Sequence, residues 1–426
     1  MGFEKSNDDP YLRGLHYALE YNSVGEPAIR TQAPGGFNTD LFGRTKISEP
    51  FTLFDSFHRY KLSGDFSTLS AGSGGVTYDA NASAKSMNVT SASGDKVYCE
   101  TYKVFPYQPG KSLQVMHSFV FSPALTGLRQ RVGYFGLQNG VFLELSDSTV
   151  YIVKRSYVTG SVEEERITQA NWNNDPMDGT GPSKVILDLE KAQIFWQEYE
   201  WLGVGSVQTG FVINGKFIVC HTFQHANIIS STYMTTATLP IRYEIENTAG
   251  TSGSSTLKQI CCTVISNGGY NRDTVEYTAT RTSSVTTSSS ILPVIALRLN
   301  SSRLDSVVFP KTISIGATSV NGVIQWSLIK NPTTALDGSW NNFTTTGTVD
   351  TNVSAANAVV GGTVVRSGII STSSQTAVSQ DIGGLNRFDL QLGRDQSGNS
   401  DVLVVAVQAL NGTPSVYSAL AWQELT

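Results

Sequence analysis

The chain has 426 residues, a formal net charge of −5, and charged side chains at only 15% of its positions. Its lysines and arginines are scattered among the acids, which argues against nucleic acid or an anionic membrane surface as a main partner. The length favours two or three domains. Low charge together with 39 glycines is typical of β-sheets joined by tight turns.

The first ten residues, MGFEKSNDDP, are polar and contain no apolar core of the kind that an export signal needs. The longest apolar runs, at 291–297 and 402–407, are far too short to span a bilayer and suit buried strands. We therefore expect a protein that folds in the cytosol and does not enter a membrane.

Residues 1–45 are interpreted as an N-terminal arm that cannot form a core of its own. Polar residues 7–9 and Pro10 predict the start of a short helix at Tyr11, running to Leu19. Glycines and prolines between 25 and 36 keep the following chain irregular. We predict that the arm docks on its own body or on a neighbouring subunit. The docking side chains would be Tyr11, Leu12, Leu15, Phe42, Phe51 and Phe54.

Residues 46–276 are predicted to form a large β-sandwich of jelly-roll type. Residues 112–121 (SLQVMHSFVF) show the alternation of a half-buried strand. Residues 141–153 contain two strand-like runs around a turn at Asp147–Ser148. The clearest hairpin centres on Asn214–Gly215, because this pair readily adopts the positive φ angles of a two-residue turn. Repeated hairpins favour a sandwich or jelly roll.

Residues 277–290 (YTATRTSSVTTSSS) are dominated by serine and threonine and are interpreted as a linker, with an exposed strand as the alternative. A second β domain is predicted over residues 291–426. No fixed-period repeat is visible, which argues against solenoids and propellers. The predicted fold class is therefore all-β, with β-sandwich or jelly-roll domains behind an irregular N-terminal arm that contains a short helix.

Potential metal and cofactor ligands do not occur at the spacings that such sites require. His221 and His225 are four residues apart, but they follow a hairpin and have no acid at metal spacing. The acidic loop 173–179 lacks the alternation of a calcium-binding EF-hand, and a loosely bound calcium ion is kept as the alternative there. We expect neither a cofactor nor a resident metal. The four cysteines are predicted to be free, buried thiols: Cys99, Cys220, Cys261 and Cys262.

One segment could carry chemistry. In residues 195–201 (FWQEYEW), Glu198 and Glu200 are two positions apart on a predicted strand, so both carboxylates share a face with Trp196, while Trp201 faces the other way. Paired carboxylates beside aromatic rings are typical of sugar-cleaving and sugar-binding sites. The third acid of such enzymes is missing, so we favour a solvated polar face beside core aromatics and expect no enzyme.

Two regions resemble structural proteins of tailed bacteriophages, especially those of marine phages and cyanophages. The first is residues 38–56, NTDLFGRTKISEPFTLFDS. The second combines residues 307–314 (VVFPKTIS) and 324–332 (IQWSLIKNP) with Trp340 and the closing 421–424 (AWQE). The resemblance implies a virion component made in the host cytoplasm, but it assigns no functional residue.

The sequence therefore predicts a non-enzymatic virion protein of the tail, baseplate or fibre, acting in assembly or host attachment. Its partners would be other virion proteins, further copies of itself (a trimer is favoured), and a host surface glycan as an additional candidate. The alternatives are a capsid decoration protein and a carbohydrate-binding or carbohydrate-cleaving β-sandwich using Glu198, Glu200, Trp196 and Trp201.

Overall fold

The computed structural model describes residues 49–425, apart from 272–273, 319–320, 346, 373–374 and 382–389, and also describes two short strands before them. The chain forms two compact units, Met1–Glu49 and Pro50–Thr426. In the first unit, β1 (Leu19–Tyr21) pairs antiparallel with β2 (Pro27–Ile29). Leu19, expected at the end of a helix, therefore lies in a strand. The rest of that predicted helix lies outside the described residues, as do Tyr11, Leu12, Leu15 and Phe42.

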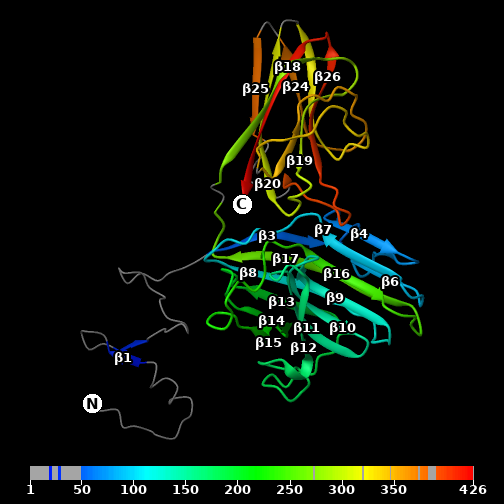
Figure 1. Ribbon diagram of the computed structural model, residues 1–426, viewed down its shortest axis with the longest axis vertical. Coiled ribbons are helices and arrows are strands. Elements are labelled where there is room, and N and C mark those ends of the chain that lie inside the picture. The colour runs from blue at the N-terminus through cyan, green and yellow to red at the C-terminus, as the bar shows by residue number, and fades with distance from the viewer. Residues whose placement is uncertain are drawn as a thin grey trace. The chain divides into compact units, whose positions relative to one another are not determined.

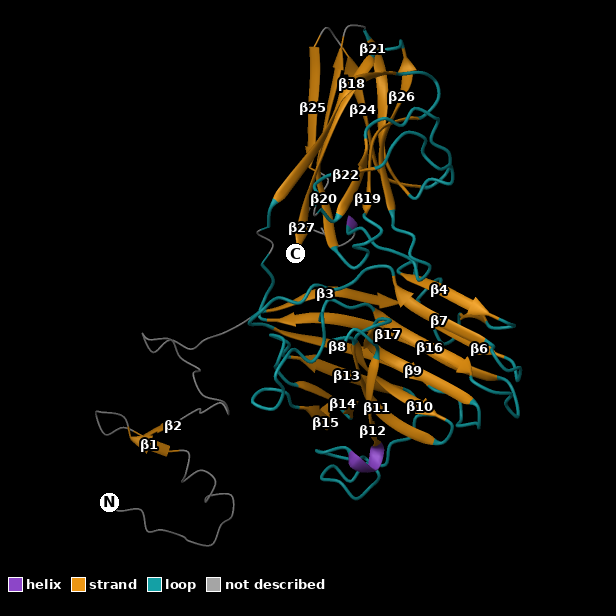
Figure 2. Ribbon diagram, in the orientation of Figure 1, coloured by secondary structure: helices purple, strands orange, loops and turns teal. Residues whose placement is uncertain are grey.

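The second unit is built almost wholly of antiparallel strands (Figure 2). Among the described residues, helical conformation is limited to the 3-10 turn Gln169–Asn171 and Leu390. The predicted all-β class is thus confirmed. No helix in the described part of the chain is long and apolar enough to cross a membrane.

Two sheets form the large sandwich (Figure 1). In sheet order, the seven-stranded sheet contains β12 (Glu163–Thr168), β11 (Thr149–Ser156), β10 (Gly140–Ser146), β9 (Leu128–Phe135), β16 (Ile241–Asn247), β7 (Lys96–Thr101) and β4 (Phe66–Ala71). The eight-stranded sheet contains β15 (Lys216–Phe223), β14 (Val207–Ile213), β13 (Gln193–Tyr199), β8 (Ser112–Val120), β17 (Ser255–Asn267), β6 (Ala84–Val89) and β5 (Gly75–Asp79). Its eighth strand, β3 (Pro50–Phe57), pairs with the second half of β17.

The two sheets enclose one hydrophobic core, drawn from residues between Leu53 and Val264. Apolar side chains alternate along the strands because every second residue of a strand faces the core. The hairpin predicted at Asn214–Gly215 is confirmed, since these residues join β14 to β15 with φ angles of 51° and 75°. The turn at Asp147 is confirmed as well, with φ at 53° between β10 and β11.

A second sandwich follows, with its own core between Ala279 and Trp422. Its four-stranded sheet contains β18 (Glu276–Thr286), β27 (Ser415–Leu425), β20 (Val307–Thr318) and β25 (Gln375–Asp381). Its six-stranded sheet contains β22 (Asn341–Asn342), β23 (Val349–Asn352), β19 (Leu292–Leu299), β26 (Val402–Asn411), β21 (Gly322–Lys330) and β24 (Thr363–Thr372). Most of the segment 277–290 is therefore strand β18 rather than a linker, because its alternating Tyr277, Ala279 and Val285 pack on this core.

Contacts from the segment before β26 join the two sandwiches. Arg394 donates hydrogen bonds to Glu100 and to Asp305, and its backbone amide donates to the carbonyl of Tyr102 (2.9 Å). Gln391 Nε2 donates to the carbonyl of Val104 (2.8 Å). The side chain of Val104 packs in a small cluster with residues of the second sandwich: Val307, Phe309 and Leu425.

Candidate functional site

Strand β13 divides its side chains between the two faces of the eight-stranded sheet, as its alternation predicts. Phe195 and Tyr199 are fully buried in the core of the large sandwich. Ile194, Trp196 and Glu198 point the other way, because neighbouring residues of a strand face opposite sides. We call this side, which faces away from the core, the outer face. The predicted site residues on β13 therefore lie on one surface.

Trp196 is nevertheless only 3% exposed. Phe217 of β15 lies across it, with the two ring centroids 5.5 Å apart. Trp196 stands opposite Gly210 of β14, where an added Cβ would lie 3.1 Å from the indole nitrogen. The tryptophan ring is thus covered by its own sheet and does not form the open platform that sugar stacking requires.

The open part of the outer face is an apolar hollow of about 360 Å³. Two rows of paired residues line it: Ile194, Ser118, Cys261 and Phe57 in one row, and Met116, Thr263 and Asp55 in the next, which Trp196 continues beyond the hollow. Phe57 is 56% exposed and Ile194 is 41% exposed, so large apolar side chains at its margin face solvent. A contiguous exposed apolar patch is a candidate interaction site, whereas apolar side chains exposed singly are ordinary.

This hollow was not predicted from the sequence. The signal was present in β13, which carries apolar residues at both alternating positions (Ile194, Phe195 and Trp196) and so predicts a strand that is apolar on two sides.

One of the four cysteines differs from its prediction. All four are free, but Cys261 is exposed at the hollow, whereas Cys99, Cys220 and Cys262 are buried.

The predicted carboxylate pair separates at the end of β13. Glu198 Oε1 accepts hydrogen bonds from Ser112 Oγ (2.7 Å) and Asn267 Nδ2 (3.3 Å). Glu200 lies beyond the strand, in a loop, where its side chain accepts from Ser206 Oγ (3.2 Å). Trp201 packs against the core side, as predicted for the face opposite to Glu198.

A second acid on the outer face, Asp55, is too distant to act with Glu198 in glycoside cleavage. Three strand spacings separate β3 from β13, which amounts to about 14 Å. The carboxyl groups of glycosidases lie roughly 5 to 9.5 Å apart. The outer face therefore presents two separate carboxylates beside an apolar hollow.

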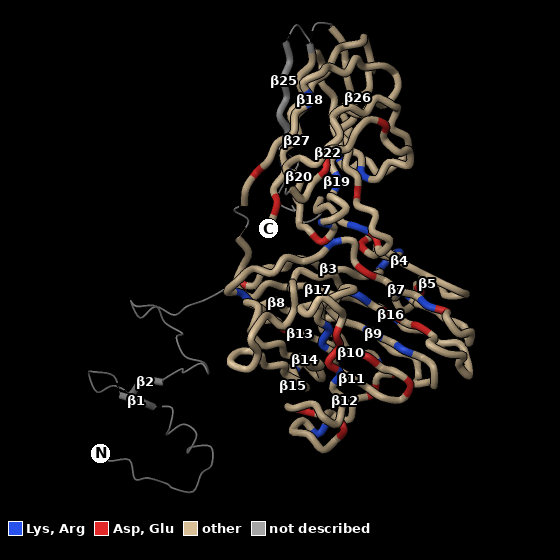
Figure 3. Tube along the Cα trace, in the orientation of Figure 1, with Lys and Arg blue, Asp and Glu red and all other residues tan. Residues whose placement is uncertain are grey.

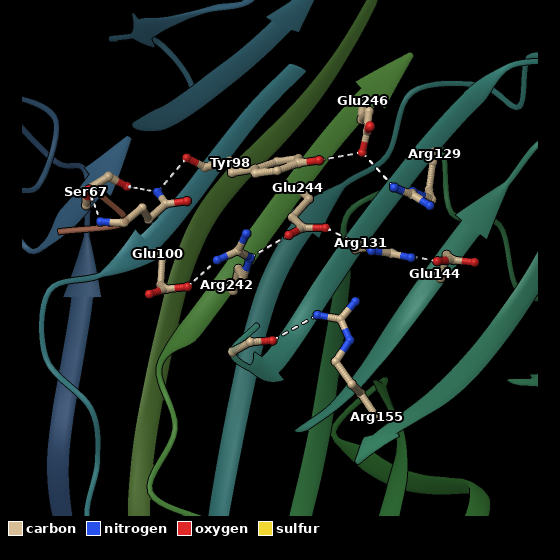
Figure 4. Close-up of polar contacts among 12 residues, drawn as sticks. Ser67, Tyr98, Glu100, Arg129, Arg131, Glu144, Arg155, Arg242, Glu244 and Glu246 are labelled. Carbon is tan, nitrogen blue, oxygen red and sulfur yellow. Dashed lines mark hydrogen bonds and ion pairs between the residues drawn. The ribbon is translucent and has the colours of Figure 1, made fainter. Parts of the chain in front are cut away.

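The opposite sheet has a very different outer surface. Basic and acidic residues lie side by side on β7, β16, β9 and β10 of the seven-stranded sheet (Figure 3). Figure 4 shows them as a chain of ion pairs running from strand to strand. Arg242 bonds to Glu100 and, through Nε, to Glu244 (2.5 Å). Arg131 then bonds to Glu244 (3.3 Å) and to Glu144 (2.6 Å). We call these five residues the ion-pair row.

All five side chains of the ion-pair row are buried. Burial raises the pKa of the Glu244 carboxyl, but Arg242 and Arg131 outweigh burial and hold that pKa below its usual value. The row continues through Arg155, which donates to Glu164 (2.7 Å) and lies over the ring of Phe142 (5.0 Å). Since these guanidinium groups are bonded to carboxylates within the sheet, their charges are satisfied inside the fold and offer little to a ligand.

This row was not predicted from the sequence. Its signal is the alternation of charged with apolar or amide residues, as in 129–131 (RQR) and 242–246 (RYEIE).

The two histidines are core groups. His221 Nδ1 accepts from the amide of Asn173 (3.3 Å), and the ring of His225 stacks on Tyr233 at 3.9 Å. Burial lowers the pKa of both. In the acidic loop, both carboxylate oxygens of Asp175 accept backbone amides. No group of three or more potential metal ligands occurs among the described residues.

Two of the predicted docking residues, Phe51 and Phe54, belong to β3. The ring of Phe54 packs in the core against Phe105 (4.9 Å), and Phe51 stacks on Tyr270 (5.7 Å). Both rings therefore contact residues of the large sandwich.

No family model and no curated protein matches the chain. Among solved structures, it is similar to a protein of unknown function from Shewanella oneidensis MR-1, at 11% identity and a TM-score of 0.35, covering 64% of this chain and 100% of that one. It is also similar to a β-glucanase of Bacillus licheniformis, at 10% identity and a TM-score of 0.33, covering 52% of this chain and 99% of that one. Peanut lectin is similar at 10% identity and a TM-score of 0.32, covering 53% of this chain and 100% of that one. At these values, the likenesses assign neither a family nor an activity to this chain.

Proposed function

We propose that this chain is a non-catalytic assembly or attachment protein that binds a protein partner through the outer face of its eight-stranded sheet. The apolar hollow supports this proposal. Phe57 and Ile194 project beside it into solvent, although burying such side chains is worth roughly 1.5–3 kcal/mol each. An apolar centre bordered by polar and charged groups, here including Asp55, is the arrangement of protein interfaces.

The finer proposal is a virion component of a tailed bacteriophage, in the tail, baseplate or fibre, with capsid decoration as the alternative location. It rests on the resemblance at residues 38–56 and in the second sandwich. In this proposal the chain is assembled in the host cytoplasm and associates with other virion proteins and with further copies of itself.

A complementation experiment tests both the docking function of the outer face and the proposal that the chain is a virion component. In a phage that carries this gene, the wild-type protein and an Ile194→Asp variant are supplied in turn, and their copy number is measured in purified particles. We expect at least a tenfold loss of incorporation for Ile194→Asp, because a buried aspartate lacks a partner in an apolar interface. Ile186→Asp is the matched control, since Ile186 is also exposed but does not line the hollow.

Two outcomes would contradict the proposal. Absence of the wild-type chain from purified particles would exclude a virion component. Normal incorporation of a folded Ile194→Asp variant would exclude the outer face as the docking surface.

A second candidate function is glycan binding on the same face. It is favoured by the polar row beside the hollow, where Glu198 pairs with Gln114 on one side and Gln208 on the other. Carboxylates and amides are the groups that recognise sugar hydroxyls. Screening the protein and its Glu198→Gln variant on a glycan array, with a reducing-end assay for hydrolysis, distinguishes the candidates. Glycan binding or cleavage that Glu198→Gln abolishes would replace the protein-docking proposal.

A further inference from the structure

We infer that the outer face accepts an extended peptide segment of the form basic–x–apolar–x–basic. This inference rests on the proposed docking function of that face and adds the chemistry of the partner. The apolar residue would pack at the edge of the hollow, and the two basic residues would reach Asp55 and Glu198.

The first step concerns charge. Strands β3, β8 and β13, which form most of the hollow, contain no lysine or arginine. The one lysine of β17, Lys258, already pairs with Asp79 (3.3 Å). Besides Lys258, the charged residues within these four strands are Asp55, which lines the hollow, and Glu198, which lies beyond it on β13. Neither carboxylate has a cationic partner within the described part of the chain.

This local excess of negative charge is specific to the outer face. On the opposite sheet, each carboxylate of the ion-pair row is bonded to an arginine. A partner that buries the hollow would also desolvate Asp55, because this residue lines it. Such a partner is favoured only if it supplies a positive charge.

The second step concerns spacing. Asp55 and Glu198 are three strands apart across the sheet and one row of residues apart along it, which amounts to about 16 Å. Residues i and i+4 of an extended chain are about 13 Å apart and point to the same side, together with residue i+2. Long Lys or Arg side chains at i and i+4 can span the remaining distance, while residue i+2 lies beside Met116 and Thr263, at the edge of the hollow.

The third step excludes a second copy as the preferred occupant. The strands that form the hollow carry acids and no free base, so two such faces would bring carboxylates together without a counter-charge. Like charges across an interface disfavour association by several kcal/mol.

Synthetic peptides test the inference with the full-length chain. The probe is acetyl-Lys-Ser-Phe-Ser-Lys-amide, and its binding is measured by calorimetry and by NMR shifts of residues at the hollow. Two controls have matched size: acetyl-Glu-Ser-Phe-Ser-Glu-amide, and the permuted acetyl-Lys-Lys-Phe-Ser-Ser-amide. We expect the probe to bind at least tenfold more tightly than either control.

Charge reversal provides the second arm. The double variant Asp55→Lys with Glu198→Lys should bind the lysine probe at least tenfold more weakly and should gain binding of the glutamate peptide. Glu163→Lys, an exposed acid on β12 of the other sheet, should leave binding unchanged.

Equal binding of all three peptides, or no change on charge reversal, would overturn the inference. If the probe fails while Ile194→Asp still blocks incorporation into particles, the partner chemistry is wrong and the docking function stands. If the probe binds but Ile194→Asp is incorporated normally, the docking function fails instead. Concentration-dependent dimerisation lost in Ile194→Asp would identify a second copy as the occupant and contradict the inference.

Discussion

At the scale of single residues, the core of the large sandwich contains a histidine that is held neutral. His117 is fully buried between the sheets, and its Nε2 lies 3.2 Å from Gln197 Oε1. Gln197 uses its own Nε2 to donate to the carbonyl of Val141, so its oxygen accepts from His117. His117 therefore carries its proton on Nε2, and burial lowers its pKa to about 3.

This burial makes stability depend on pH. An unfolded histidine has a pKa of about 6.5, so below that pH unfolding takes up a proton that the folded state does not bind. The contribution of neutral His117 to the free energy of unfolding is fully present above pH 6.5. It is lost as pH falls from 6.5 toward the pKa of the folded state. We expect His117→Gln to reduce the slope of unfolding free energy against pH, between pH 6 and 4, by about 1.4 kcal/mol per unit.

Urea denaturation at a series of pH values measures this slope. Above pH 6.5 the two proteins should give parallel lines, which serves as the internal control. Identical slopes below pH 6 would show that His117 is protonated in the folded protein.

At the scale of strands, the ion-pair row acts as a set of cross-strand links. Glu100 stands opposite Arg242, and Arg131 stands opposite both Glu244 and Glu144. A shift of one residue in any of these strands would turn its charged side chains into the core. The row therefore specifies the register of β7, β16, β9 and β10.

Arg131→Met tests the energetic role of the row. Removing Arg131 takes one of two arginine partners from each of two buried carboxylates, since Glu244 keeps Arg242 and Glu144 keeps Arg166. We therefore expect a loss of about 3 kcal/mol in the free energy of unfolding. Lys258→Met is the matched control, because its ion pair with Asp79 is partly exposed and should be worth less than about 1 kcal/mol. Urea denaturation gives both values, and equal losses would contradict a special role for burial.

Strand features set by neighbouring residues could be predicted from the sequence, and features set by distant residues could not. The hairpin at Asn214–Gly215 could be predicted because two adjacent residues of these types favour positive φ angles, which both adopt. The alternation of β13 correctly placed Glu198 on the outer face. The burial of Trp196 was missed because Phe217 reaches it from two strands away. The ion-pair row was missed because Arg131 and Glu244 are 113 residues apart in sequence.

At the scale of the second unit, two separate cores are joined through a small number of polar contacts. Arg394 is central, since it bonds to Glu100 of the large sandwich and to Asp305 of the second one. Gln396 adds hydrogen bonds to the carbonyls of Ser67 (3.0 Å) and Tyr98 (2.9 Å). We expect these contacts to couple the unfolding of the two sandwiches.

We expect Arg394→Ala to weaken that coupling. The wild-type residues Pro50–Thr426 should melt in one calorimetric transition, and the variant should melt in two, because Glu100 loses one of its two arginines and the junction loses its central donor. Arg366→Ala on β24 is the control, as this exposed arginine lies away from the junction. A single transition in Arg394→Ala would show that the apolar cluster around Val104 suffices.

The contrast between the two outer surfaces has a consequence for the ionic strength at which the protein can work. In 0.1 M salt, the attraction between exposed charges decays over a distance of about 10 Å, and over a shorter distance in more concentrated salt. Buried ion pairs are screened far less. Binding through Asp55 and Glu198 should therefore weaken steeply in concentrated salt. The sheet that contains Arg131 and Glu244 should keep its strength there, because water and ions are excluded from its charges. A brine that releases the partner would leave the fold intact.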